Sequence, residues 1–431
     1  MGRVNQPVVL ESGRTTPAAG ARRVLVLLLA INLFNYIDRQ VLAAVLPKIG
    51  GEMLGGDTSS GVKLGWLATA FLFSYMLASP IFGWLADRVS RWMLVGVGVI
   101  VWSLASGESG RANLYLHLLI TRMFVGIGEA AYGPAAPTLI SDYFPVAVRG
   151  RVMAWFYMAI PVGSAIGYQL GGVMAEYGHW RWAFYSVVPP GILLGLLCLL
   201  MWRRPAAIQE TAVPRTGERA RAGAYLTLLR TPSYVYNCLG MAALTFAIGG
   251  ISHWMPTYIN QFRGAGDIGR VNLIFGSITV ITGITATLLG GIVGDRLRGR
   301  IRGAYFVVSG LGLLAAFPFF VLMLYTPFPL AWVWVFLSEF CLFFNTGPSN
   351  TALANVAHPS VRASAFALNI FVIHALGDAI SPPIIGRMTD HFHQNMNPGF
   401  LLVGAMMVVG GVLWLAGARH LDRDTERASV A

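Results

Sequence analysis

The stretch "GWLADRVSR", Gly83–Arg91, follows an apolar segment and returns later in the chain as "GIVGDRLRGR", Gly291–Arg300. The aligned pairs, at an offset of 208 residues, are Gly83 with Gly291, Asp87 with Asp295 and Arg88 with Arg296. A weaker match, "VRGRVMAWF" with "VRASAFALN", aligns Arg149 with Arg362 at an offset of 213 residues. Two matches at nearly one offset indicate that half of the chain is a duplicate of the other half. Many secondary transporters have this architecture.

Composition places this repeat in a membrane. The chain has 431 residues, of which 55% are hydrophobic and 12% are charged, whereas soluble domains carry about 25% charged residues. The formal net charge of +12 is compatible with a nucleic-acid partner. On so apolar a chain, however, a basic excess more often reflects loop charges that fix the orientation in the bilayer. We therefore expect a polytopic membrane protein that binds no nucleic acid.

Twelve apolar segments are candidates for crossing a bilayer, which takes about 20 residues per helix. They are roughly Val24–Leu46, Leu64–Ala86, Trp92–Ser106, Leu114–Tyr143, Arg151–Glu176, Ala183–Trp202, Ser233–Phe262, Val271–Gly294, Ala304–Tyr325, Ala331–Asn355, Ala363–Met388 and Gly399–Gly417. The sequence predicts an all-α membrane protein with twelve transmembrane helices in two pseudo-symmetric six-helix bundles.

The longest polar connection, Arg203 to Gly223, is rich in Pro, Gly and charge and separates six segments from six. The predicted units are an N-terminal tail (1–23), a first bundle (24–202), a linker (203–230), a second bundle (231–418) and a C-terminal tail (419–431). With both termini in the cytoplasm, 22 of the 31 Lys and Arg residues fall on the cytoplasmic side and 7 on the other. Cytoplasmic loops carry such an excess, so we expect a multi-pass protein of the cell (inner or plasma) membrane with cytoplasmic tails and linker.

The first predicted helix contains "NLFNYIDRQVLAAVLP", Asn32–Pro47, with two adjacent charges. A charge inside a bilayer is costly, and it usually faces a cavity or a partner. Asn35 and Arg39 share one helical face, and Asp38 lies about 100° around the helix from Arg39. We favour charges that line a transport cavity. The alternative is an ion pair that only locks this helix to a neighbour.

The fourth predicted helix carries Arg122 and Glu129, seven residues apart on one face. Seven residues span about 10.5 Å along a helix axis, so we expect each side chain to find its partner on another helix. Our hypothesis is that Arg122 exchanges between Asp38 and Glu129, and that protonation of a carboxylate frees the guanidinium for an anionic group. A static network that only fixes the first bundle is the alternative.

The second half has fewer charges within its spans. The secondary candidates are His374 and Asp378, which are spaced i, i+4, and Glu339. The histidine and aspartate could relay a proton or could simply pack as a satisfied pair. This scarcity suggests a cavity that is polar toward the first bundle and apolar toward the second. The aromatic residues available to line it are Phe275, Phe336, Phe340, Phe343, Phe344 and Phe371.

These features resemble the major facilitator superfamily, because twelve helices and a basic central loop accompany the motif in Gly83–Arg91. The departures from that motif are Ser90, where Gly is preferred, and Trp92, where a base is preferred. Longer strings are similar to a bacterial-type member of the Spinster family of lysolipid and sphingolipid transporters. They are "NLFNYIDRQVLAAVLP", "RMFVGIGEAAYGPAAPTLISDYFP" (Arg122–Pro145), "YMAIPVGSAIGYQLGG" (Tyr157–Gly172) and "HALGDAISPPIIGRMTD" (His374–Asp390).

The resemblance implies roles for residues that match the family's pattern. Proton coupling or gating falls to Asp38 and Glu129, and substrate binding to Asn35, Arg39 and Arg122. The repeated loop motif implies a latch that closes the cytoplasmic face, although its charges could serve orientation alone. The residues of this gate motif are Gly83, Asp87, Arg88, Arg91, Asp295 and Arg296.

The sequence therefore favours a secondary transporter that moves a lysolipid or sphingolipid-like anionic amphiphile by alternating access, coupled to protons. One alternative is a proton-coupled symporter of a small organic anion or sugar acid, and another is a lipid sensor that transports nothing. The chain has no G-x-x-x-x-G-K-[ST], G-x-S-x-G or H-E-x-x-H motif, which argues against ATP drive and against an enzyme. We expect a monomer in the bilayer, with a lipid and protons as partners and with no cofactor or metal.

Overall fold

The computed structural model describes residues 17–55, 57, 59–86, 88–202, 228–358 and 361–430. In this part of the chain the first half forms α1 (Ala21–Met53), α2 (Ser60–Ala86), α3 (Arg91–Arg111), α4 (Tyr115–Ala130), α5 (Ala135–Tyr143), α6 (Val146–Tyr177) and α7 (Arg181–Trp202). The second half forms α9 (Pro232–Thr257), η2 (Tyr258–Phe262), α10 (Ile268–Leu297), α11 (Ala304–Tyr325), α12 (Ala331–Phe343), α13 (Thr346–Val356), α14 (Arg362–Ile373), η3 (His374–Asp378), α15 (Ser381–His391) and α16 (Asn397–Val430).

Ten helical stretches of the described chain are long and apolar enough to cross a membrane. The fourth and tenth predicted segments are each broken into two helices, at residues 131–134 and 344–345. Proline explains both breaks, because its ring clashes with the carbonyl four residues earlier and it has no N–H to donate. Pro134 stands four residues after Ala130, the last residue of α4, and Pro348 stands four residues after Phe344, which directly follows the end of α12.

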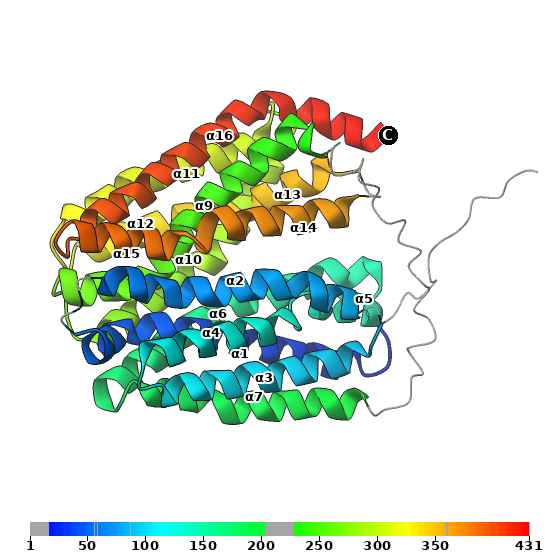
Figure 1. Ribbon diagram of the computed structural model, residues 1–431. Coiled ribbons are helices and arrows are strands. Elements are labelled where there is room, and N and C mark those ends of the chain that lie inside the picture. Colours follow the sequence, from blue (N-terminus) through cyan, green and yellow to red (C-terminus); the bar gives the residue numbers. More distant parts are fainter. Residues whose placement is uncertain are drawn as a thin grey trace, which may run out of the picture.

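The helices form two groups that lie side by side along most of their length (Figure 1). In the first group α1 packs on α6, and α3 packs on α7. In the second group α9 and α11 both pack on α16. The groups meet mainly where α6 touches α10 and where α2 touches α15.

Glycine permits the close approach of α1 and α6. A Cβ atom added at Gly163 would lie 2.6 Å from the Leu33 carbonyl oxygen, and one at Gly167 would lie 2.5 Å from that of Ile37. Small residues at such spacing allow the backbones of membrane helices to touch. This contact holds α1, which carries the charged stretch, against the rest of its bundle.

The last helix is longer than the sequence predicts, because α16 continues through Val430 into the predicted tail. Asp424 anchors this extension on α9, since its Oδ2 accepts hydrogen bonds from the Ser233 backbone nitrogen at 3.1 Å and from the Ser233 hydroxyl at 2.8 Å. At the other terminus, α1 already begins at Ala21. Most of the predicted linker, and residues 1–16 of the N-terminal tail, lie outside the described residues.

Candidate functional site

Polar side chains gather inside the first bundle at the middle of α1 and α4. Asp38, Arg122 and Glu129 are each 1% exposed, and Asn35 is 2% exposed. Because an unpaired charge inside a spanning segment costs several kcal/mol, the partners of each group decide what the site can do.

Arg39 and Glu129 form the ion pair of this site. Arg39 Nε donates to Glu129 Oε2 at 2.8 Å, and its Nη2 lies 2.7 Å from the same oxygen. The Asn35 side chain lies beside this carboxylate. The Arg39 side chain is 20% exposed, whereas the Glu129 side chain is fully covered. Glu129 thus has a partner on another helix, but that partner is Arg39 and not Arg122, which the sequence favoured.

Three aromatic rings surround the Arg39 guanidinium. Its central carbon lies 5.0 Å from the ring centroids of Tyr36 and Phe71 and 5.4 Å from that of Tyr75. A guanidinium within about 6 Å of an aromatic face is attracted to the ring. The rings therefore hold Arg39 in place while leaving part of its edge open.

Asp38 points away from Arg39, toward α3. Its Oδ1 accepts a hydrogen bond from the Ser106 hydroxyl, and its Oδ2 has no hydrogen-bond partner. Arg122 is the cation that acts most strongly on this carboxylate, ahead of Arg39. The two adjacent charges of α1 consequently reach different neighbours, Asp38 toward α3 and Arg122, and Arg39 toward Glu129.

Arg122 is the least satisfied group of the cluster. Its Nε and Nη1 are buried without a hydrogen-bond acceptor, and it makes no ion pair within 4 Å in the described part of the chain. The Phe71 ring lies 5.6 Å from its central carbon. A guanidinium offers five donors in a planar fork that matches carboxylate and phosphate. The site therefore contains a cation with donors free for an anionic group.

The second bundle reaches this cluster through Tyr75. The ring of Tyr75 meets that of His374 edge-on, with 6.2 Å between centroids. His374 Nδ1 lies 2.9 Å from Asp378 Oδ1, so the i, i+4 pair suggested by the sequence forms. The pair sits in the π-helical turn η3, where Gly377 has non-helical backbone angles.

The aromatic residues suggested for the cavity lie in different surroundings. Phe275 is 1% exposed and is covered by Tyr168. Phe336 and Phe340 of α12 and Phe344, directly after this helix, follow one another with ring centroids 6.3 and 6.1 Å apart. Phe371 is 53% exposed.

The gate motif makes contacts within its own bundle. Arg91 Nη1 pairs with Asp142 Oδ2 of α5 at 2.5 Å, and Asp295 Oδ1 accepts a hydrogen bond from the Tyr305 hydroxyl at 2.8 Å. Arg88 lies over the Trp84 ring, 3.8 Å from its centroid. Arg296 is exposed, and Asp87 lies outside the described residues. Cβ atoms added at the repeated glycines, Gly83 and Gly291, would meet nothing within 4 Å.

The opposite end of the bundles, which we call the far end, is remote from the start of α1 and the end of α16. There Asp390 of α15 caps α2, since its Oδ1 and Oδ2 accept from the backbone nitrogens of Gly61 and Val62 at 2.9 and 2.8 Å. Further hydrogen bonds between the bundles in the described chain lie toward this end. They are Thr69 to the Ala379 carbonyl, Tyr168 to that of Ser252, His253 to that of Leu64, Gln261 to that of Pro47, Asn272 to that of Ala44, and Gln169 to the Ser277 hydroxyl.

A cavity of about 390 Å³ lies at the far end, between α1, α2, α9 and the end of α15. Its lining includes Leu64, Trp254 and Gln261. Asp57 also lines it, and a hydrogen bond from the Lys63 ammonium holds the pKa of Asp57 below its ordinary value.

Sequence reasoning did not single out Ser106, Tyr36, Phe71 or Tyr75. Only Tyr36 carried a usable signal, because it stands three residues before Arg39 and so shares its helical face. The other three come from α2 and α3, and no pattern within those helices ties them to α1. The described residues hold no group of three or more His, Cys, Asp or Glu that could bind a metal ion.

A family model for the Major Facilitator Superfamily matches residues 28–382. Human protein spinster homolog 1 is 34% identical, over 94% of this chain and 82% of its own. A sphingosine-1-phosphate transporter of Danio rerio is 30% identical, over 92% of this chain and 84% of its own.

Solved structures share the fold. A bacterial homologue of the human lysosomal transporter Spinster, in an inward-facing and unoccupied conformation, superposes with a TM-score of 0.80 at 20% identity. That alignment covers 94% of this chain and 98% of the other. A D-xylose–proton symporter has a TM-score of 0.72 at 16% identity, over 91% of this chain and 96% of its own.

Proposed function

The chain belongs to the major facilitator superfamily and, within it, to the Spinster family, and from this premise we propose that it moves an anionic amphiphile by proton-coupled alternating access. The substrate is a lysolipid or a sphingolipid-like phosphate. The observation that carries the proposal is the buried guanidinium of Arg122, with two donors unpartnered and two carboxylates nearby.

The proposed binding step uses the free donors of Arg122. A phosphate head group accepts from the guanidinium in a bidentate manner, and the partly exposed edge of Arg39 offers a second cation at the same site. Asn35 adds a neutral donor beside Glu129.

Protonation supplies the coupling in this proposal. Asp38 and Glu129 are the groups that take up and release the proton, since both carboxylates lie beside the arginines that hold the head group. A proton on Glu129 removes the charge that holds Arg39, and Arg39 is then free to follow the anion. A proton on Asp38 removes the negative charge that acts most strongly on Arg122, although the two side chains form no ion pair.

We assign the end of the bundles where α1 starts and α16 ends to the cytoplasm, because most Lys and Arg residues in the loops fall on that side. The contacts between bundles at the far end and the open space at Gly83 and Gly291 then correspond to an inward-facing state. In the other state the gate motif would bring the cytoplasmic ends together. The protein acts as a monomer in the cell membrane.

The test is flux of a labelled lysophospholipid and of a labelled sphingoid phosphate in proteoliposomes, with and without a pH gradient. We expect lipid flux that rises with the gradient.

The variants test the assigned residues. Arg122→Ala should abolish flux while the unfolding temperature of the protein stays unchanged. Asp38→Asn and Glu129→Gln should weaken the dependence of flux on pH. Surface Arg111→Ala, on the exposed end of α3, is the matched control. Absence of lipid flux, with uptake of a small organic anion, would favour the symporter instead, and binding of lipid without flux would favour a sensor.

A further inference from the structure

Glu339 on α12 is a buried carboxyl group that the proposed cycle does not use. It is 5% exposed, and no charged side chain of the described residues pairs with it. Its polar contacts are the hydroxyls of two α10 threonines. Thr279 Oγ1 lies 3.4 and 3.2 Å from Oε1 and Oε2, and Thr282 Oγ1 lies 3.4 Å from Oε2.

Each of these hydroxyls lies closer to a backbone carbonyl of its own helix than to Glu339. Thr279 Oγ1 donates to the Phe275 carbonyl at 3.0 Å, and Thr282 Oγ1 donates to the Ile278 carbonyl at 2.8 Å. A hydroxyl has one proton to donate and two lone pairs. A hydroxyl that donates to its backbone carbonyl presents only lone pairs to Glu339, and a neutral carboxyl group can then donate its one proton to either threonine oxygen.

Distance supports the same assignment. Hydrogen bonds from a hydroxyl to an ionised carboxylate are about 2.5–2.7 Å long, and the contacts of Glu339 are all at least 3.2 Å. An ionised group with such long contacts in a spanning helix would be several kcal/mol too costly. The surroundings of Glu339 thus fit the neutral acid.

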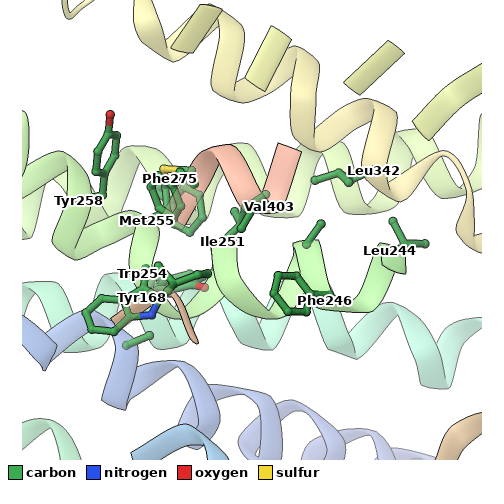
Figure 2. Packing of buried hydrophobic residues seen from close by; sticks show 14 of the residues in the cluster. Tyr168, Leu244, Phe246, Ile251, Trp254, Met255, Tyr258, Phe275, Leu342 and Val403 are labelled. Carbon is green, nitrogen blue, oxygen red and sulfur yellow. The ribbon is translucent and has the colours of Figure 1, made fainter. Parts of the chain in front are cut away.

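Glu339 lies next to the contact between α6 and α10, which helps to close the far end. Thr279 is one turn of α10 from Phe275, whose ring meets that of Tyr168 on α6 with 4.9 Å between centroids. The Tyr168 hydroxyl donates to the Ser252 carbonyl of the second bundle at 2.7 Å. Figure 2 shows Tyr168, Trp254 and Phe275 in one packed cluster. Separation of α6 from α10 would uncover the side of α10 that holds Glu339.

We propose that Glu339 is a proton-binding residue that must be neutral for α6 to pack on α10, so that its deprotonation favours opening of the far end. On opening, the carboxyl group releases its proton to entering water and becomes a carboxylate. On closing, it takes a proton from that water before it is buried. This inference rests on the proposed proton coupling and extends it to the second bundle.

Two other titratable groups bear on this contact. Tyr168 of α6 is the titratable neighbour of Glu339 among the described residues. Asp390 of α15 is the carboxylate that caps α2 at this end. Opening of the far end at raised pH is assigned to Glu339.

The experiment measures the distance across the far end in the full-length protein in nanodiscs, without lipid substrate. Spin labels replace Lys48 on α1 and Arg270 on α10, which are both exposed, after Cys198, Cys238 and Cys341 are changed to Ala. Pulsed electron resonance then reports the distance as the pH is raised. Glu339→Gln keeps the shape of the neutral acid and cannot ionise. Glu108→Gln, at a surface acid that is 46% exposed, is the matched control.

We expect the wild type and Glu108→Gln to shift from a short to a long distance as the pH rises, and Glu339→Gln to stay short throughout. Glu339→Asp should still respond to pH, but with the midpoint of the distance change at a different pH. This variant provides the test if Glu339→Gln does not fold. A response in Glu339→Gln equal to that of the wild type, or no response in the wild type, would overturn the proposal. So would a distance that follows sodium concentration at fixed pH, since the oxygens would then bind a cation. Failure of lipid flux in proteoliposomes would count against the proposed function and leave this result untouched.

Discussion

The two bundles bury the same residue at related positions and satisfy it differently. Glu339 follows Glu129 by 210 residues, between the offsets of 208 and 213 that relate the two halves of the sequence. Both acids stand just before the proline-induced break of their helix. Glu129 has Arg39 at 2.7 Å, whereas Glu339 has two threonine hydroxyls at 3.2–3.4 Å.

This difference shows that the two halves share the position of a buried glutamate but not the electrostatic surroundings of its carboxyl group. In the first bundle the acid is held as an ion by a cation from another helix. In the second bundle no cation faces the acid within the described chain, so burial favours the neutral form. The same carboxyl group can thus serve as an anchor for arginine in one bundle and as a proton carrier in the other.

The largest expected effect is the loss of Arg39. Arg39→Ala would leave Glu129 buried without its counter-charge, and breaking a buried pair costs about 3–5 kcal/mol. We expect the free energy of unfolding to fall by about 3 kcal/mol, the lower end of that range, because the Arg39 side chain is 20% exposed. Denaturant unfolding in detergent measures it. The double variant Arg39→Ala/Glu129→Gln should recover much of the loss, and equal instability of both variants would show that the pair is not the cause.

The same substitution at both acids tests the comparison directly. Glu129→Gln removes the counter-charge of Arg39 and should lower the free energy of unfolding by about 2 kcal/mol. Glu339→Gln replaces one neutral donor by another and should change it by less than about 0.5 kcal/mol. Similar losses at the two positions, measured at neutral pH, would mean that Glu339 is buried as an ion.

A smaller effect is expected at the far end, where the two bundles hold each other. Asp390→Ala removes the cap of α2, and such caps contribute about 1 kcal/mol. The labelled distance across the far end should lengthen. Asp422 accepts from the Gly303 backbone nitrogen within the second bundle, at 3.2 and 3.1 Å, so Asp422→Ala should cost similar stability and leave that distance unchanged. Equal lengthening in both variants would count against a specific role for Asp390.

The smallest effect belongs to the repeated glycines. Gly83→Ala and Gly291→Ala place a methyl group in open space, and replacing a helical glycine should raise stability by about 0.5 kcal/mol. Lipid flux should nevertheless fall if these helix ends approach each other in the proposed outward-facing state. Gly61→Ala should instead lower stability, because its Cβ would lie 2.6 Å from the Gly386 carbonyl oxygen. Unchanged flux in the first two variants would argue that these glycines play no part in closure.

The fold could be predicted because its signals are local or repeated. Apolar length marked the spans, and the duplicated motif marked the two halves. The helix breaks were readable in principle from Pro134 and Pro348, but a continuous apolar run masked them. The extension of α16 depends on Asp424 meeting Ser233, which are 191 residues apart, and no local pattern reports such a contact.

The candidate site was predictable in its members and not in its pairing. A charged residue within an apolar run is visible in the sequence. Such residues include Asp38, Arg39, Arg122 and Glu129. Which arginine meets Glu129 depends on the rotation and depth of α1 against α4. This rotation and depth are set by contacts such as that of Gly163 on α6 with α1. The resulting arrangement leaves Arg122 without a partner.

Five of the hydrogen bonds that close the far end share a chemical asymmetry. Thr69, Tyr168, His253, Gln261 and Asn272 donate from their side chains, and the acceptors are backbone carbonyls of the other bundle. Every residue type carries a carbonyl, so the accepting positions can change identity during evolution without loss of the bond. Sequence drift should therefore be tolerated on the accepting side and resisted on the donating side, and a deep mutational scan should record that imbalance.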